Sequence, residues 1–110
     1  MSQRRFVHLG INPFGSGAAV PGATVPPNYT VVLEHYLDTL DAPYGDWFRY
    51  GSQNYVVWTS LAPDDLAKQI RNLPGFQNVY VLATEMGTTP VLCNGLMSKR
   101  FWEWLHRPRS

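Results

Sequence analysis

Charged residues are scarce in this chain. Asp, Glu, Lys and Arg make up 15% of its 110 residues, and the formal net charge is +1. An average soluble domain has about a quarter of its residues charged, and an intrinsically disordered segment combines high charge with few apolar residues. Because 45% of this chain is apolar, we exclude disorder and expect one folded domain over residues 1–110.

Cysteine is nearly absent as well. The single cysteine, Cys93, excludes an internal disulfide and a multi-cysteine metal site. Its sequence neighbours are Leu92 and Asn94, and no basic residue stands close to it. A nucleophilic thiolate needs an electropositive setting, so the favoured interpretation of Cys93 is an inert side chain.

Long hydrophobic runs are also missing. No stretch of 18 apolar residues occurs, so we expect no transmembrane span. Arg4 and Arg5 stand near the first residue but no apolar run of 7–15 residues follows them, so we expect no signal peptide. The resulting prediction is a cytoplasmic protein with no membrane partner.

Aromatic residues, in contrast, are abundant: the chain has four Trp, six Tyr and five Phe. A domain of this length buries only about two-thirds of its surface, and few charges are available to cover the rest. We therefore expect an unusually aromatic core, an apolar surface that meets a partner, or both.

The charges that are present divide unevenly along the chain. Residues 6–97 hold three basic and seven acidic side chains, a net of −4, whereas both flanking segments are basic. The overall charge does not indicate nucleic-acid binding. The two basic ends would nevertheless form a local basic patch if they met in space.

The hydrophobic periodicity predicts four strands and three helices. In chain order these are a strand at 6–11, a helix at 28–40, strands at 47–50 and 55–59 around a tight turn, a helix near 62–73, a strand at 79–84 and a final helix at about 98–106. Asn28 and Ser60 are suitable N-caps for the first two helices. Pro63 and two Asp residues suit the first turn of the second helix.

A long segment rich in Gly and Pro, residues 12–27, separates the first strand from the first helix. Its length is typical of a functional or mobile loop. It contains neither of the glycine patterns that cradle phosphate groups, and Pro26 and Pro27 remove two backbone donors near the helix start. A partner-binding loop is therefore favoured over a phosphate site.

This element order predicts an α+β fold of the ferredoxin-like type, β-α-β-β-α-β, with an antiparallel sheet, two helices on one face and an additional C-terminal helix. Since strand residues alternate between the two faces, the second face needs its own cover. The last helix or a second chain would supply it.

Five stretches, in this order and spacing, resemble the short SinR-like proteins, which are relatives of the small ferredoxin-like subunit of the CRISPR adaptation complex and of VapD-type toxins. They span about residues 5–106: Phe6–Leu9, Asn28–Leu40, the hairpin Trp47–Tyr50 with Tyr55–Thr59, Leu61–Leu66 and Gly95–Leu105. The resemblance implies a ferredoxin-like homodimer that is open to contact with nucleic acid. Nuclease-type relatives place an Asp metal ligand at the end of the first strand, where this chain has Asn12.

Asn12 brings no charge, and hard cations such as Mg²⁺ favour carboxylates. The resemblance therefore implies an interaction module with little or no catalytic activity, no metal and no cofactor. We expect a homodimer or another protein partner to contact its aromatic anchors: Trp47, Tyr55, Trp58, Trp102 and Trp104.

Two alternatives stay open. A nuclease of the same superfamily would use Asn12 and Asp46 together with the basic residues Arg4, Arg5, Lys99 and Arg100. A single-stranded RNA-binding platform would stack bases on an open sheet through Arg49, Tyr50 and Tyr55. The three histidines, His8, His35 and His106, have no second ligand at metal spacing.

Overall fold

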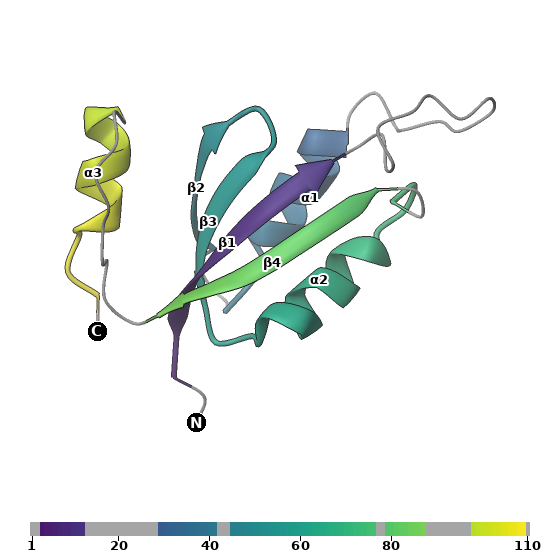
Figure 1. Ribbon diagram of the computed structural model, residues 1–110, viewed down its shortest axis with the longest axis horizontal. Helices are drawn as coiled ribbons and strands as arrows, with labels where there is room; N and C mark the ends of the chain where they lie inside the picture. The colour runs from purple at the N-terminus through teal and green to yellow at the C-terminus, as the bar shows by residue number, and fades with distance from the viewer. Residues whose placement is uncertain (1–2, 13–28, 42–44, 77–78, 88–97, 110) are drawn as a thin grey trace.

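The computed structural model describes residues 3–12, 29–41, 45–76, 79–87 and 98–109 (Figure 1). Most of the Gly- and Pro-rich segment 12–27, the proposed cap Asn28 and the lone Cys93 lie outside these residues. The elements in chain order are β1 (Arg5–Asn12), α1 (Tyr29–Leu37), β2 (Asp46–Gly51), β3 (Asn54–Thr59), α2 (Pro63–Arg71), β4 (Tyr80–Gly87) and α3 (Lys99–Leu105).

The four strands form one antiparallel sheet in the order β2-β3-β1-β4. In the register, Leu9 lies between Tyr55 on one side and Ala83 on the other. β1 and β3 occupy the two central positions, so their side chains supply the middle of each face. The prediction of a mixed α and β fold with an antiparallel sheet is confirmed.

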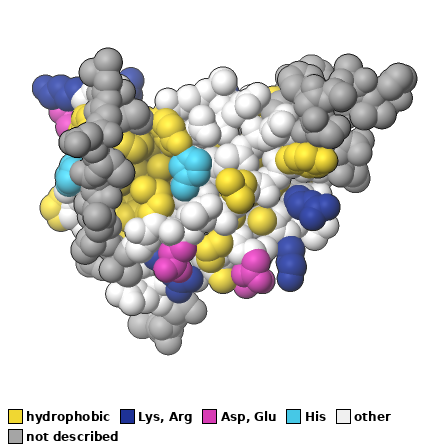
Figure 2. All heavy atoms as spheres, viewed as in Figure 1, with side chains coloured by type: hydrophobic (Ala, Val, Ile, Leu, Met, Phe, Trp, Pro, Cys, Tyr) yellow, Lys and Arg dark blue, Asp and Glu magenta, His cyan; other side chains and the backbone are white. Residues whose placement is uncertain are grey.

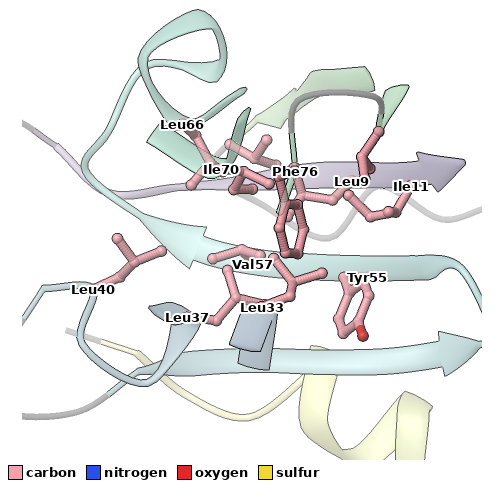
Figure 3. Close-up of a cluster of buried hydrophobic side chains, with 12 residues drawn as sticks. Leu9, Ile11, Leu33, Leu37, Leu40, Tyr55, Val57, Leu66, Ile70 and Phe76 are labelled. Carbon is pink, nitrogen blue, oxygen red and sulfur yellow. The ribbon is translucent and has the colours of Figure 1, made fainter. Parts of the chain in front are cut away.

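The larger core lies between this sheet and helices α1 and α2 (Figure 3). Leu33 and Leu37 come from α1, Leu66 and Ile70 come from α2, and all four are fully buried. The sheet contributes alternate residues of its central strands to the same cluster: Val7, Leu9, Ile11, Tyr55 and Val57. These two helices therefore cover one face of the sheet.

Helix α3 packs on the opposite face, over β2, β3 and the beginning of β1 (Figure 1). Phe101 and Leu105 of α3 are buried there against Phe6 and Val56 of the sheet. Further aromatic residues surround this second cluster: Phe48, Tyr50, Trp58, Trp102 and Trp104. Much of the aromatic content of the sequence is thus packed inside the chain.

Helix α1 ends at Leu37, three residues before the predicted end at residue 40. The backbone N–H groups of Thr39 and Leu40 bond to carbonyls three residues earlier, which tightens the last turn. The chain then turns back at Asp41, whose φ of 50° lies in the left-handed region. At Gly45 the backbone passes close to the end of α1. A Cβ at this position would lie 2.3 Å from the carbonyl oxygen of Leu37.

The prediction that Ser60 caps the second helix is wrong. The N-cap of α2 is Ala62, and no side chain caps the helix. The hydroxyl and backbone N–H of Ser60 instead donate to the carboxylate of Asp41, which ties the end of β3 to the turn after α1. In α3, Ser98 is the N-cap, and its side chain accepts a hydrogen bond from the N–H of Phe101 at 3.1 Å.

Among the described residues, no helix has the length and apolar character needed to cross a membrane.

Substitution of Leu37 by Ala tests the main core. We expect a loss of about 2–5 kcal/mol of unfolding free energy, because the substitution leaves a cavity between α1 and the sheet. Val31→Ala is the matched control, since Val31 is on the same helix and 61% exposed; its effect should stay within about 0.5 kcal/mol. Denaturant unfolding measures both, and equal effects would contradict the assignment of the core.

Candidate interaction surface

The half of the sheet that α3 does not cover belongs to β1 and β4. Gly10 pairs with Leu82, and Leu82 points to the same face as Phe6 and α3 because strand residues alternate. Tyr80 and Leu82 are 58% and 64% exposed, although both are large and apolar. Figure 2 views this face and shows hydrophobic side chains both beside α3 and over the β1–β4 half.

The outer strands β2 and β4 differ in how they are protected. β2 carries Asp46 and Arg49 and has an irregular register between Arg49 and Gly51. Charges and bulges of this kind hinder pairing with another strand. β4 has one charged residue, Glu85, and its irregular pairing with β1 is confined to the end that contains Glu85. The segment from Tyr80 to Thr84 is regular and uncharged, and among the described residues β4 is paired with β1 alone.

His8 and Tyr50 form the boundary between the covered and uncovered halves of the face. The Nε2 atom of His8 is hydrogen-bonded to the hydroxyl of Tyr50, and the Tyr50 ring lies 5.6 Å from the ring of Phe101 in α3. Burial lowers the pKa of His8 and raises the pKa of Tyr50. Both effects favour the neutral forms, which suit a position beside apolar surface.

Asp46 fixes the far end of α3 to the sheet. Its Oδ1 accepts hydrogen bonds from Nε1 of Trp104 and from Nη2 of Arg107, each at 2.8 Å, and its Oδ2 accepts from Nε of Arg109 at 2.7 Å. Burial opposes ionisation of this carboxyl group, but the hydrogen bonds and positive charges of the two arginines outweigh it. The pKa of Asp46 therefore lies below its ordinary value.

Arg109 is the most enclosed of these partners, with 8% of its side chain exposed. Its guanidinium carbon lies 4.6 Å from the ring centre of Trp104, 5.1 Å from that of Phe6 and 5.6 Å from that of Trp58. Its Nη2 also donates to the carbonyl oxygen of Trp104 at 2.8 Å, within the last turn of α3. Arg109 thus stabilises the C-terminal end of α3, because a cation is favoured at the negative end of the helix dipole.

The five aromatic residues predicted as interface anchors all have partners within the chain. Tyr55 is fully buried in the main core, so it has no surface to offer a partner. Trp47 packs against the same core, and its Nε1 donates to Asp38 at 2.8 Å. Trp58, Trp102 and Trp104 pack around the cluster under α3 and stay partly exposed.

The structure separates the two residues of the proposed nuclease site. Asp46 pairs with Trp58, which pairs with Phe6 at the beginning of β1, whereas Asn12 is the last residue of β1. Six residues of strand from Phe6 to Asn12 amount to about 20 Å, so the two side chains are too far apart to share a metal ion within one chain. The described ranges contain no group of three or more His, Cys, Asp or Glu side chains that could hold one.

The predicted basic residues do not gather into one patch. Arg4 and Arg5 lie where the chain enters β1, and Lys99 and Arg100 begin α3 at the other end of the sheet (Figure 1). Most of them face acidic partners: Arg4 lies 3.9 Å from Asp41, Arg5 lies 3.4 Å from Glu85 and Lys99 lies 3.7 Å from Glu103.

Arg49, Tyr50 and Tyr55 do not form one stacking surface either. Arg49 and Tyr55 are partners in the register and face α1, where both contact Glu34. Burial, together with the Glu34 carboxylate, raises the pKa of Tyr55. Tyr50 points to the opposite face, beside His8 and Phe101.

The sequence interpretation overlooked three residues of this surface: Tyr80, Leu82 and Arg109. For the first two the sequence carried no signal, because residues 79–83 are all apolar and both faces of the strand look alike. In the structure, Val81 and Ala83 pack against the main core and leave Tyr80 and Leu82 on the other face. Arg109 had no comparable signal, since its aromatic contacts come from three different elements.

Comparison with protein-family models, with curated proteins and with solved structures finds no match to this chain.

Asp46→Asn tests the attachment of α3. A carboxyl group whose folded pKa is lowered stabilises the fold above its unfolded pKa of about 3.9, and this stabilisation is lost as the pH falls through the folded pKa. At pH 7 we expect the variant to lose about 1–3 kcal/mol of unfolding free energy, and the difference from the wild type should shrink below about pH 4.

Denaturant unfolding at several pH values measures this difference. Asp64→Asn is the control, because Asp64 is exposed in the first turn of α2 and should cost less than about 1 kcal/mol. A difference between wild type and Asp46→Asn that is the same at pH 7 and pH 3 would contradict the proposed role of the Asp46 charge.

Proposed function

We propose that the protein is a homodimeric interaction module with little or no catalytic activity, and that its two copies pair edge to edge along β4. The observation that carries the proposal is the exposure of Tyr80 and Leu82, at 58% and 64%, on an outer strand whose regular part is uncharged. Large exposed apolar side chains on a sheet edge are typical of strand pairing with another chain.

A second copy fits this edge because β4 is complementary to itself. In an antiparallel pair of β4 strands centred on Leu82, that residue faces its own copy, Tyr80 faces Thr84, and Val81 faces Ala83. No like charges stand opposite each other in these pairs. An arrangement in which the same patch serves both partners is the usual symmetry of a dimer.

The composition of the half-face favours protein over nucleic acid as the partner. Its side chains alternate outward along β1 and β4, and none is Lys or Arg: His8, Gly10, Asn12, Tyr80, Leu82 and Thr84. Binding to a phosphate backbone depends mainly on Lys and Arg contacts, whereas aromatic and aliphatic side chains predominate at the centre of protein interfaces.

The same proposal includes the family assignment. The strand order β2-β3-β1-β4, with α1 and α2 on one face, supports a ferredoxin-like fold. That fold, and a homodimer built from it, are what the resemblance to the SinR-like and CRISPR-adaptation-subunit proteins implies.

Leu82→Lys tests the interface. We expect sedimentation to show a dimer for the wild type and a monomer for the variant, because a lysine at the centre of the β4 pair would place two positive charges together. Val31→Lys is the matched control: Val31 is as exposed as Leu82, at 61%, but is on α1 on the other side of the sheet. It should leave the dimer intact.

A wild-type protein that stays monomeric at high concentration would contradict the proposed function. A dimer that survives Leu82→Lys but dissociates in Val31→Lys would place the contact on the helical side instead.

A further inference from the structure

We infer that Phe6, Trp58, Trp104 and Asp46 form a binding site for a guanidinium group, which Arg109 of the same chain fills and which an arginine side chain from a partner peptide can fill in its place. We call these four residues the guanidinium cage. The cage lies at the end of the sheet where α3 stops, and the inference does not depend on the dimer proposed for β4.

The aromatic walls of the cage contact the cation at short range. The three ring centres lie 4.6, 5.1 and 5.6 Å from the guanidinium carbon of Arg109. A cation within about 6 Å of an aromatic ring is attracted by the ring quadrupole, and the attraction is stronger where water is excluded. Here 8% of the Arg109 side chain is exposed, and Phe6 is 2% exposed.

The polar atoms of the cage match the planar shape of the group. Nε of Arg109 donates to Oδ2 of Asp46 at 2.7 Å, and Nη2 donates to Oδ1 at 3.4 Å and to the Trp104 carbonyl at 2.8 Å. Nη1 donates to the carbonyl oxygens of Leu105 and Arg107 at 3.1 and 3.0 Å. All three nitrogens thus have acceptors, which a lysine ammonium could not satisfy with the same geometry.

Contacts other than those of Arg109 also hold the walls of the cage in place. Phe6 belongs to β1, Trp58 to β3 and Asp46 to β2, and neighbouring strands hold the three together because Asp46 pairs with Trp58 and Trp58 pairs with Phe6. Trp104 is on α3, whose Phe101 and Leu105 are buried against the sheet. The site therefore persists when the cation leaves, and a guanidinium from another molecule meets the same rings and carboxylate.

Arg109→Ala empties the cage and allows a direct binding test. We expect methylguanidinium to bind this variant saturably, with a midpoint on the order of 1–10 mM. Binding should change the fluorescence of Trp58 and Trp104 and raise Tm. Methylammonium has the positive charge but not the planar set of N–H donors of a guanidinium. At the same concentrations it should bind at least tenfold more weakly.

Arg107→Ala is the matched control. Arg107 also contacts Asp46 but is 56% exposed and lies outside the aromatic walls, so its removal leaves the cage filled and should give no saturable response. The double variant Asp46→Asn with Arg109→Ala lacks the carboxylate and should lose the response. In Arg109→Lys a tethered ammonium competes for the cage without matching its acceptors, so methylguanidinium should bind, but more weakly than to Arg109→Ala.

Absence of a saturable response in both Arg109→Ala and Arg109→Lys would overturn the inference, whether or not either variant stays fully folded. Equal responses from Arg107→Ala and Arg109→Ala, or equal binding of methylammonium and methylguanidinium, would also overturn it, because either result would show a general effect of the salt.

Discussion

A sheet that carries apolar residues on both faces needs other parts of the protein to pack on each face. The rest of the structure follows from this requirement. Helices α1 and α2 bury one face completely over the central strands. On the other face, the short helix α3 is the one helix among the described residues, and its cluster reaches β2, β3, the beginning of β1 and Met86 at the end of β4. The remaining strip along β1 and β4 keeps Tyr80 and Leu82 in water, and the proposed pairing of β4 would place these side chains beside those of a second chain.

The attachment of α3 explains the unusual aromatic content and the basic segment after the helix. A seven-residue helix has little intrinsic stability, so its position depends on the aromatic cluster beneath it and on Asp46. Arg109 joins these two contributions, because it pairs with Asp46 and lies against Phe6, Trp58 and Trp104. The two arginines after α3, Arg107 and Arg109, thus serve contacts within the chain.

The sequence predicted most of the elements but little of the surface. Periodicity located all four strands and the three helices. The proposed stacking surface of Arg49, Tyr50 and Tyr55 overlooked the alternation of strand residues, which already places the neighbours Arg49 and Tyr50 on opposite faces. The sequence interpretation also missed the cage around Arg109, whose members meet only once β1, β2, β3 and α3 are assembled. The interface anchors chosen for their aromatic character have partners inside the fold.

The central claim is that β4 pairs with its copy in a second chain. Backbone hydrogen exchange measured over a range of protein concentrations tests it most directly, since pairing protects the amides of the strand that is engaged. The account predicts that protection within Tyr80–Glu85 rises with concentration while protection in β2, at the other edge, stays constant. Protection of β4 that does not change with concentration, in a protein that sediments as a dimer, would contradict it.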